Sequence, residues 1–367
     1  MVINENIFNV GKSLEGYSNP SLFFGEPPGL FDTVNRRFPK IWSLYKEMKS
    51  LDWSEDEFDY SQCNVDFKQA DPDTADMMIK TLAWQWEADS VASRSIIMTF
   101  APFITSSEYW AAVSRVSDNE IIHAATYSEI VRMSFDNPHE VLSEILAVKE
   151  AVQRLETIAE VFNQGREAGL RYAQGQEKLS QELYNKVYLT IVALLLLERI
   201  QFMASFAITF TIGGSGLFQP ICKAIQKIAQ DELEVHCELD KEVLRTEHLT
   251  EMGIIAREQT KAMVSKMFHE VVESELTWLD YLFEGRALIG TNKEIVKKWV
   301  LFNAKDVAHF LNIETEYKFP KTNPMPHMEN WLNMNKHQAA PQEQDLAQYK
   351  VNIIVNDDTN AKFDVDF

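Results

Sequence analysis

Residues 187–212, VYLTIVALLLLERIQFMASFAITFTI, form the most apolar stretch of this chain of 367 residues. The uninterrupted apolar part before Glu198 is about ten residues long, too short to span a bilayer, so the stretch predicts a buried core helix. Glu198 is conspicuous there, because a carboxylate inside a buried helix costs several kcal/mol unless a cation compensates it. A pair with Arg199 or another neighbour, or protonation of the carboxyl, would be the ordinary explanation.

Helical patterns extend from this stretch in both directions. Glycine (13) and proline (12) together make up 25 of 367 residues, about 7% against roughly 12% on average, which argues against a turn-rich all-β fold. The spacing of apolar residues predicts helices over residues 74–100, 108–134, 140–165, 178–212, 218–246, 254–286 and 292–313. The sequence therefore predicts an all-α fold.

The two ends of the chain differ from this helical part. Residues 1–35 look irregular and contain a Pro-Pro-Gly break at residues 27–29. We expect residues 36–318 to form one helical domain. From Phe319 onward prolines follow in quick succession and the last 30 residues show no steady period, so residues 319–367 predict an extended tail.

Charge and cysteine content exclude several classes of protein. The formal net charge is −20, and such a surface repels phosphate backbones and anionic lipid, so we expect no nucleic-acid partner and no membrane. Cys63, Cys222 and Cys237 have no CxxC spacing, which argues against a zinc knuckle or a disulfide framework. The first residues lack the pattern of a signal peptide, and we expect a cytoplasmic protein.

A carboxylate and histidine pattern begins in the first half of the chain. Glu120 and His123 lie one turn apart on one predicted helix. Asp89, 31 residues before Glu120, shares an inward-facing stripe with apolar residues. A Glu-x-x-His motif alone is more often a surface pair than a metal site.

The same pattern is repeated in the second half. Glu198 is followed 34 residues later by Glu232, and His236 comes four residues after that. Each half fits an antiparallel helix hairpin, and two hairpins make a four-helix bundle. Four carboxylates and two imidazoles facing inward match the ligand set of ferritin-like two-metal proteins. Hard carboxylate oxygens with imidazole suit iron or manganese better than zinc.

Three aromatic residues extend the inward stripes. Tyr127 is four residues after His123, and Phe202 and Phe206 follow Glu198 at i+4 and i+8. A phenol next to an oxidising metal pair, walled by oxidation-resistant phenylalanine, could store a stable radical. Without metals, a core tyrosine with a satisfied hydroxyl would be the more common case.

From about Trp53 to the C-terminus, the sequence closely resembles the radical-generating small subunit of class I ribonucleotide reductase. The motifs that carry the resemblance are WSEDEFD from Trp53, WQWEADS around Asp89, EIIHAATY at 120–127, LERIQFMASF at 197–206, IAQDELEVH at 228–236 and APQEQDLAQY at 340–349. The resemblance implies a ferritin-like helical bundle with a four-helix di-metal core and extra helices, which forms a homodimer.

The resemblance also implies a role for each matching residue. The metal ligands would be Asp89, Glu120, His123, Glu198, Glu232 and His236, the first three on one metal and the others on the second metal or bridging. Tyr127 would carry the radical in an apolar pocket of Phe202, Phe206 and Ile228. Asp231 would link His123 to Trp53, consistent with the rule that metal-bound imidazole donates its other N–H to a carboxylate. Tyr349 would relay the radical to the large subunit.

One departure from the family pattern concerns the second histidine. The family usually has Asp-Glu-x-x-His, whereas Asp231 to His236 contains one extra residue. Positions i+3 and i+4 lie about −60° and +40° from the first residue, so either spacing keeps both ligands on one helix face. We expect Glu234 to point away and a local π-bulge to absorb the extra residue.

The implied activity is that of a di-iron subunit, with manganese possible, that reacts with dioxygen and oxidises Tyr127. The large subunit, docked by the C-terminal tail, would reduce ribonucleotides to 2′-deoxyribonucleotides. A di-iron oxidase or monooxygenase of the same fold would explain the six ligands but not Trp53 or Tyr349. Ferritin-like iron storage has no use for the tail, and a purely structural helical protein leaves the doubled pattern a coincidence.

Overall fold

The computed structural model describes residues 21–25 and 30–332, and its regular structure there is helical. The helices are α2 (Pro39–Ser50), α3 (Ser61–Gln69), α4 (Pro72–Phe100), α5 (Ser107–Ser134), α6 (Pro138–Ile145), α7 (Lys149–Arg154), α8 (Glu156–Ala173), α9 (Gln181–Leu196), α10 (Phe202–Gly213), α11 (Gln219–Gln230), α12 (Cys237–Glu247), α13 (Glu251–Leu282), α14 (Lys293–Leu311) and α15 (Met328–Leu332). A short 3-10 helix spans Glu55–Glu57. Two π-helical turns, η3 (Leu197–Gln201) and η4 (Asp231–His236), join α9 to α10 and α11 to α12.

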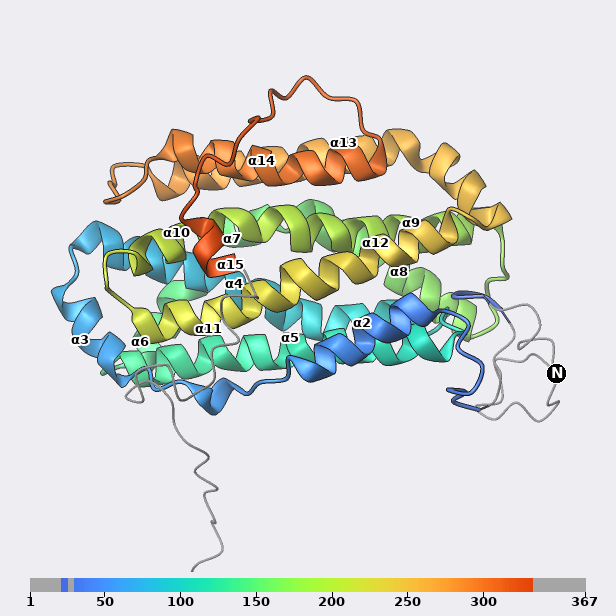
Figure 1. Cartoon of the computed structure of the whole chain (residues 1–367), viewed down its shortest axis with the longest axis horizontal. Coiled ribbons are helices and arrows are strands. Elements are labelled where there is room, and N and C mark those ends of the chain that lie inside the picture. Colours follow the sequence, from blue (N-terminus) through green and yellow to red (C-terminus); the bar gives the residue numbers. More distant parts are fainter. Residues whose placement is uncertain (1–20, 26–29, 333–367) are drawn as a thin grey trace, which may run out of the picture.

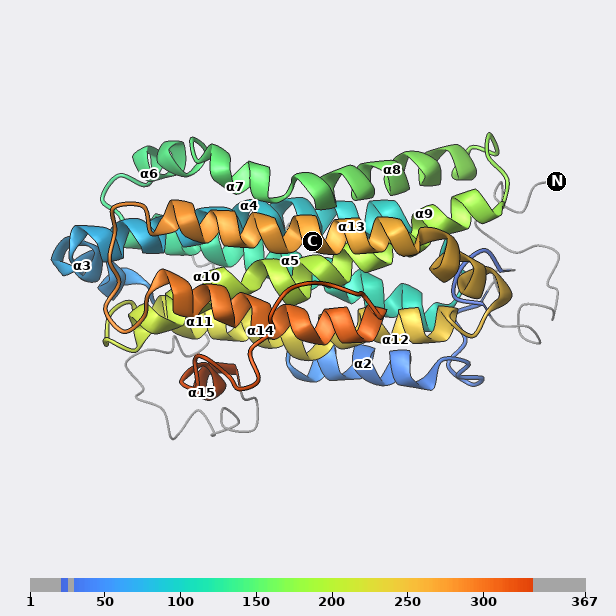
Figure 2. The ribbon, with the colours of Figure 1, turned by 90° about the horizontal axis from the view of Figure 1, so that it is seen from above.

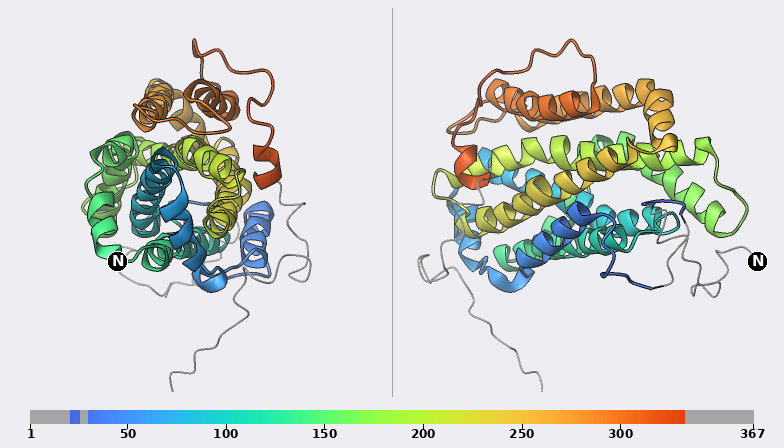
Figure 3. Two further views of the ribbon diagram at one scale, coloured as in Figure 1. Left: turned by 90° about the vertical axis from the view of Figure 1, so that its left-hand side faces the viewer. Right: turned by 45° about the vertical axis from the view of Figure 1, so that its right-hand side comes forward.

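Four helical runs form the centre of the molecule: α4, α5, α9–η3–α10 and α11–η4–α12 (Figure 1). Contacts link α4 to α5 and α10, α9 to α12, and the two π-turns to each other. Seen from above, α6, α7 and α8 cover one edge of this bundle and α2 covers the opposite edge (Figure 2). The end-on view places the α13–α14 pair on a third side (Figure 3).

The starts of the long bundle helices follow from their capping residues. The side chains of Asp71, Ser106 and Ser180 precede α4, α5 and α9, and each accepts a hydrogen bond from a backbone N–H of the first turn at 3.1–3.2 Å. These bonds satisfy N–H groups that the helix itself leaves unpaired. The caps fix where each helix begins and therefore the height at which its ligands sit.

The apolar stretch of residues 187–212 lies in the core of the bundle. From Gln181 to Gly213 the helical run is long and apolar enough to cross a membrane, but 94% of its most apolar window is buried inside the fold. Every residue of α10 is buried. This burial agrees with the prediction of a core helix.

The predicted helices are largely confirmed, with three differences. The helix predicted over 140–165 is interrupted between α6 and α7 and again at Leu155, before α8. Helices α2 and α3 were not predicted. Residues 319–332, predicted as the start of the tail, include α15, where the Trp331 ring stacks on Phe210 with centroids 4.9 Å apart.

Candidate metal centre

The first three predicted ligands come from α4 and α5. Asp89, Glu120 and His123 are all fully buried, with at most 1% of each residue exposed. The His123 Nδ1 atom lies 3.6 Å from Glu120 Oε2 and 3.9 Å from Asp89 Oδ2. The two acids therefore face the same nitrogen of one imidazole.

The other three predicted ligands come from the two π-turns. Glu198 lies on η3, and Glu232 and His236 lie at opposite ends of η4. His236 Nδ1 lies 3.1 Å from Glu232 Oε2 and 3.6 Å from Glu120 Oε1. The Glu232 carboxylate also reaches the first half, with its Oε1 3.0 Å from His123 Nδ1.

Together the six residues form two overlapping groups whose ligand atoms lie within 4.8 Å of one another. The groups are Asp89, Glu120, His123 and Glu232, and Glu120, Glu198, Glu232 and His236. Glu120 and Glu232 belong to both, so each could bridge two metal ions. The resemblance implies Glu120 as a ligand of one metal only.

The π-turn η4 resolves the register around the extra residue. Its wide turn, predicted from the spacing, brings Glu232 and His236 to the same face, while Glu234 is exposed. Glu232, and not Glu234, thus belongs to the cluster. The second π-turn, η3, was not predicted.

Electrostatics set this cluster apart from an ordinary helical core. Burial, reinforced by neighbouring carboxylates, raises the pKa of Asp89 and Glu198 well above the usual range. The pKa of Glu232 is lowered although burial opposes this, because the Glu198 carboxyl and both imidazoles favour its ionised form. Four acids buried next to two imidazoles thus cannot all be ionised at once. Bound cations would favour the ionised form of all four carboxyl groups.

The polar atoms of this cluster fit a bound cation. Both carboxyl oxygens of Asp89, Glu120 and Glu198 have no hydrogen-bond partner among the described residues. Buried polar atoms nearly always have a partner. Arg199 does not supply one to Glu198, because its guanidinium bonds Asn303 at 2.7 Å and pairs with Asp306 at 3.5 Å. The mixture of hard oxygen and imidazole ligands is that of iron and manganese sites.

A hydrogen-bonded link leads outward from His123. Its Nε2 lies 3.1 Å from Asp231 Oδ2, and the Trp53 Nε1–H donates to the same oxygen at 2.8 Å. The rings of Trp53 and His123 stack with centroids 5.9 Å apart. The residues that the resemblance joined through Asp231 are therefore joined in the fold.

His236 has a comparable support that the sequence did not reveal. The side-chain amide of the buried Asn119 lies 3.2 Å from His236 Nε2. The atom at 3.2 Å is the amide nitrogen, which donates to Nε2 when the imidazole proton is on Nδ1. With a metal on Nδ1, Nε2 would carry the proton, and the Asn119 amide, turned over, would accept it through its oxygen. In the sequence, only the position of Asn119 directly before Glu120 could have indicated this role.

Tyr127 is buried one helical turn after His123, and its hydroxyl has no hydrogen-bond partner in the described part of the chain. Burial raises its pKa well above the usual range, and Asp89 is the carboxylate that adds most to this shift. Phe202, Phe206 and Ile228 are fully buried in the same core, with the two phenylalanine rings stacked 5.5 Å apart. Tyr349 lies outside the described residues.

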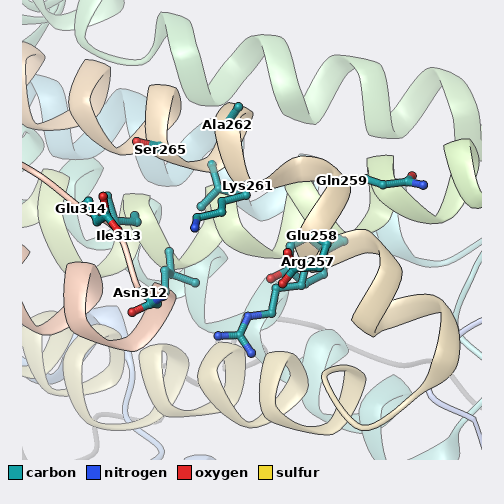
Figure 4. A pocket seen from close by; sticks show the side chains of 12 residues that line it. Arg257, Glu258, Gln259, Lys261, Ala262, Ser265, Asn312, Ile313 and Glu314 are labelled. Carbon is teal, nitrogen blue, oxygen red and sulfur yellow. The ribbon is translucent and has the colours of Figure 1, made fainter.

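A surface pocket on α13 is separate from this centre. A pocket of about 550 Å³ lies between α13 and the segment that follows α14, lined by Arg257, Lys261, Ser265 and Asn312 among others (Figure 4). None of the six predicted ligands lines it. The candidate centre is enclosed by the bundle and not set in this pocket.

Comparisons with known proteins agree with the geometry. A model of the family "Ribonucleotide reductase, small chain" matches residues 30–324. The ribonucleoside-diphosphate reductase subunit beta of Buchnera aphidicola (from Schizaphis graminum) is 25% identical over 360 residues, covering 93% of this chain and 94% of the relative. The corresponding subunit 1 beta of Escherichia coli O157:H7 is 26% identical over 351 residues, covering 90% and 91%.

Solved structures share the fold. The ribonucleotide reductase R2 subunit of Clostridium botulinum superposes with a TM-score of 0.74 at 18% identity, covering 89% of this chain and 97% of that one. The dimanganese(II)-NrdF of Streptococcus sanguinis gives a TM-score of 0.67 at 16% identity, covering 82% and 98%. With most of its length matched by the family model and the bundle and its acid–histidine cluster in place, this chain belongs to the ribonucleotide reductase small-chain family.

Proposed function

We propose that this small subunit binds two metal ions and uses them to generate a radical on Tyr127. The ions would be held by Asp89, Glu120, His123, Glu198, Glu232 and His236, of which Glu120 and Glu232 belong to both groups of ligands. The observation that carries the proposal is the enclosed cluster of unpaired carboxylate oxygens one helical turn from the buried Tyr127 hydroxyl. A storage protein or a structural bundle has no need of that tyrosine.

The metal pair, once reduced and exposed to dioxygen, supplies the oxidising power for this reaction. Tyr127 would give one electron to the oxidised centre and its hydroxyl proton to the carboxylate of Asp89, which raises the pKa of Tyr127 more than any other carboxylate. The apolar core then protects the phenoxyl from water and from other reductants. Phe202 and Phe206 are suited to this role because phenylalanine is not readily oxidised and both rings are fully buried.

The radical leaves Tyr127 through a chain of polar and aromatic groups. The contacts from His123 through Asp231 to Trp53 support such a path, since they join the metal centre to an oxidisable indole. Tyr349, in the C-terminal tail, completes the relay to the large subunit. The names of the curated relatives support a ribonucleoside diphosphate as the substrate held by that partner. We further propose that the chain acts as a homodimer.

Iron is the metal we propose, with manganese as the alternative. Both accept hard carboxylate oxygens together with imidazole nitrogen. The Streptococcus sanguinis neighbour is a dimanganese protein of the same fold. Metal analysis of the purified protein distinguishes the two.

The proposal is tested by adding ferrous iron and air to the metal-free protein, followed by metal analysis and EPR. We expect two irons per chain and a tyrosyl signal that disappears in Tyr127→Phe while the iron content holds. Tyr109→Phe is the matched control, because Tyr109 is equally buried on the same helix, α5, and should keep the signal. Two irons without a tyrosyl signal would favour the oxidase, and many irons per chain would favour storage.

A further inference from the structure

Two tryptophans other than Trp53, Trp84 and Trp278, lie buried in the helical core. Trp84 precedes Asp89 by five residues on α4, about 7.5 Å of helix rise. Its ring meets Phe202, of the proposed radical pocket, edge-on at 5.0 Å. Trp278 on α13 is 2% exposed. Trp84 thus shares a helix with a predicted ligand and contacts the proposed radical pocket, where it could donate an electron to an oxidised centre.

A buried cation lies against both indoles. Arg154, the last residue of α7, has its guanidinium carbon 3.6 Å from the Trp84 ring centre and 4.9 Å from that of Trp278. Its Nη2 donates to Glu275 Oε2 at 2.6 Å and to the carbonyl of Gln201. Glu275 bonds the edge of the guanidinium, whereas the Trp84 ring lies against its central carbon.

The same arrangement continues from Trp278 toward the surface. The ring of Tyr281 lies 5.4 Å from Trp278. Lys80 Nζ lies 6.0 Å from the centre of the Tyr281 ring, and the guanidinium carbon of Arg286 lies 5.8 Å from it. Each oxidisable ring in the row from Trp84 to Tyr281 therefore has a cation over it.

The charged group next to Trp53 is an anion and not a cation. Its Nε1–H donates to the Asp231 carboxylate at 2.8 Å, so an oxidised Trp53 has a nearby anion and an acceptor for its proton. The Nε1–H groups of Trp84 and Trp278 have no acceptor within the described ranges. Their oxidised forms would remain positively charged next to a guanidinium. A cation attracts a neutral ring but repels an oxidised one.

We propose that Arg154 keeps Trp84 and Trp278 out of the electron transfer that forms the radical, and thereby restricts oxidation to Tyr127 and Trp53. This inference rests on the proposed function. In the reaction that Arg154 suppresses, one electron passes from the Trp84 indole to the oxidised metal centre, which is reduced by one electron, and the indole becomes a radical cation. Arg154 acts through Trp84 and is a positioning residue, not a catalytic one.

The test removes the charge without leaving an unpaired buried ion. Arg154→Met with Glu275→Gln replaces both partners by neutral side chains of similar length. The parent, this pair variant, Arg154→Lys, and the pair variant with Trp84→Phe are each loaded with ferrous iron and exposed to air. EPR measures the tyrosyl radical per metal pair, and peptide mass spectrometry measures oxidation at each tryptophan after repeated cycles.

In the parent we expect Trp84 and Trp278 to stay unoxidised. The pair variant should lose at least half of the tyrosyl yield and acquire oxidation at Trp84. Adding Trp84→Phe should restore the yield, and Arg154→Lys, which keeps a cation, should match the parent. These results would establish the role of the charge.

The inference is overturned if the pair variant binds two irons and keeps the full yield, or if Arg154→Lys loses as much yield as the pair variant. Should the pair variant not fold, the parent alone decides the question. Oxidation of its Trp84 as extensive as that of Trp53, beside a normal tyrosyl radical, would refute the inference and leave the proposed function standing. A parent without any tyrosyl radical would refute the proposed function and this inference with it.

Discussion

At the scale of single residues, Glu198 provides the test that distinguishes a metal ligand from an ordinary buried acid. Its carboxyl is 1% exposed and both of its oxygens lack partners among the described residues. Glu198→Ala should reduce the metal content from two ions to about one per chain, because the second group loses a ligand that only it contains. Metal analysis after dialysis measures this.

The matched control for Glu198→Ala is Glu234→Ala, which removes an exposed carboxylate from η4 and should leave two ions bound. Full occupancy in Glu198→Ala would show that Glu198 is not a ligand. Loss of metal in both variants would point to a general effect of charge.

Glu247 gives a prediction about pH that does not depend on the metal. It is 3% exposed at the end of α12, and burial raises its pKa to about 8. A raised folded-state pKa means that the protonated carboxyl stabilises the fold fully below about pH 4, and that this contribution is lost as the pH rises through about 8. The loss amounts to at most about 5 kcal/mol.

Urea unfolding of the parent and of Glu247→Gln at pH 5.5 and 8.5 tests this. The parent should lose free energy of unfolding relative to Glu247→Gln at the higher pH. Glu251→Gln, at an exposed position at the start of α13, should behave as the parent does. Equal pH dependence in parent and Glu247→Gln would mean that Glu247 titrates normally in the fold.

At the scale of elements, the π-turn η4 holds one more residue than the family spacing requires. Because Glu234 is exposed there, deleting it should convert the turn to regular α-helix and leave Glu232 and the histidine on one face at i+3. We expect the deletion variant to bind two metal ions and to unfold at a temperature no lower than the parent.

The control is Glu234→Ala, which removes the Glu234 side chain but keeps the extra residue in the turn. Metal analysis and thermal unfolding are the measurements. A folded deletion variant that binds fewer than two ions would show that the wide turn is itself needed to aim His236.

The long bundle helices could be predicted because apolar periodicity and capping residues are local properties. The sequence also revealed the wide turn in η4, since an inserted residue between Glu232 and His236 is visible against the family motif. It did not reveal η3, because LERIQ carries no insertion and its widening depends on tertiary packing. The break at Leu155 could not be predicted either, because the residues on both sides of it suit a continuous helix.

The candidate site could be predicted where several residues share a pattern, and not where a residue acts alone. The six ligands occur as a doubled spacing, and Trp53 and Asp231 lie in family motifs. Asn119 and Arg154 are single polar residues in helical segments, where a solvent-exposed position is the more common expectation. Their roles depend on partners 117 and 121 positions away in the chain.

At the scale of the whole molecule, the tail is predicted to perform two separable tasks. It ends DDTNAKFDVDF, with acids that favour encounter with a partner and two phenylalanines that a partner groove could bury. Deleting the last eight residues should abolish binding to the large subunit and leave the Tyr127 signal intact. Pull-down and EPR on the truncated chain measure these two effects.

Tyr349→Phe tests the second task of the tail. This variant should bind the large subunit and hold the radical, yet support no nucleotide reduction, since phenylalanine cannot carry the radical. The complementary outcome, normal turnover by Tyr349→Phe with the cognate large subunit, would remove Tyr349 from the relay and favour the oxidase alternative.

The unpaired oxygens of the metal centre also bear on how long the protein lasts in a cell. Without metal, the folded chain encloses acids whose raised pKa values record an unfavourable burial. Ions that bind only the folded state add free energy of unfolding by mass action. Because proteases act on transiently unfolded chains, unloaded subunits would be degraded sooner than loaded ones. Metal supply would then set the abundance of this subunit as well as its activity.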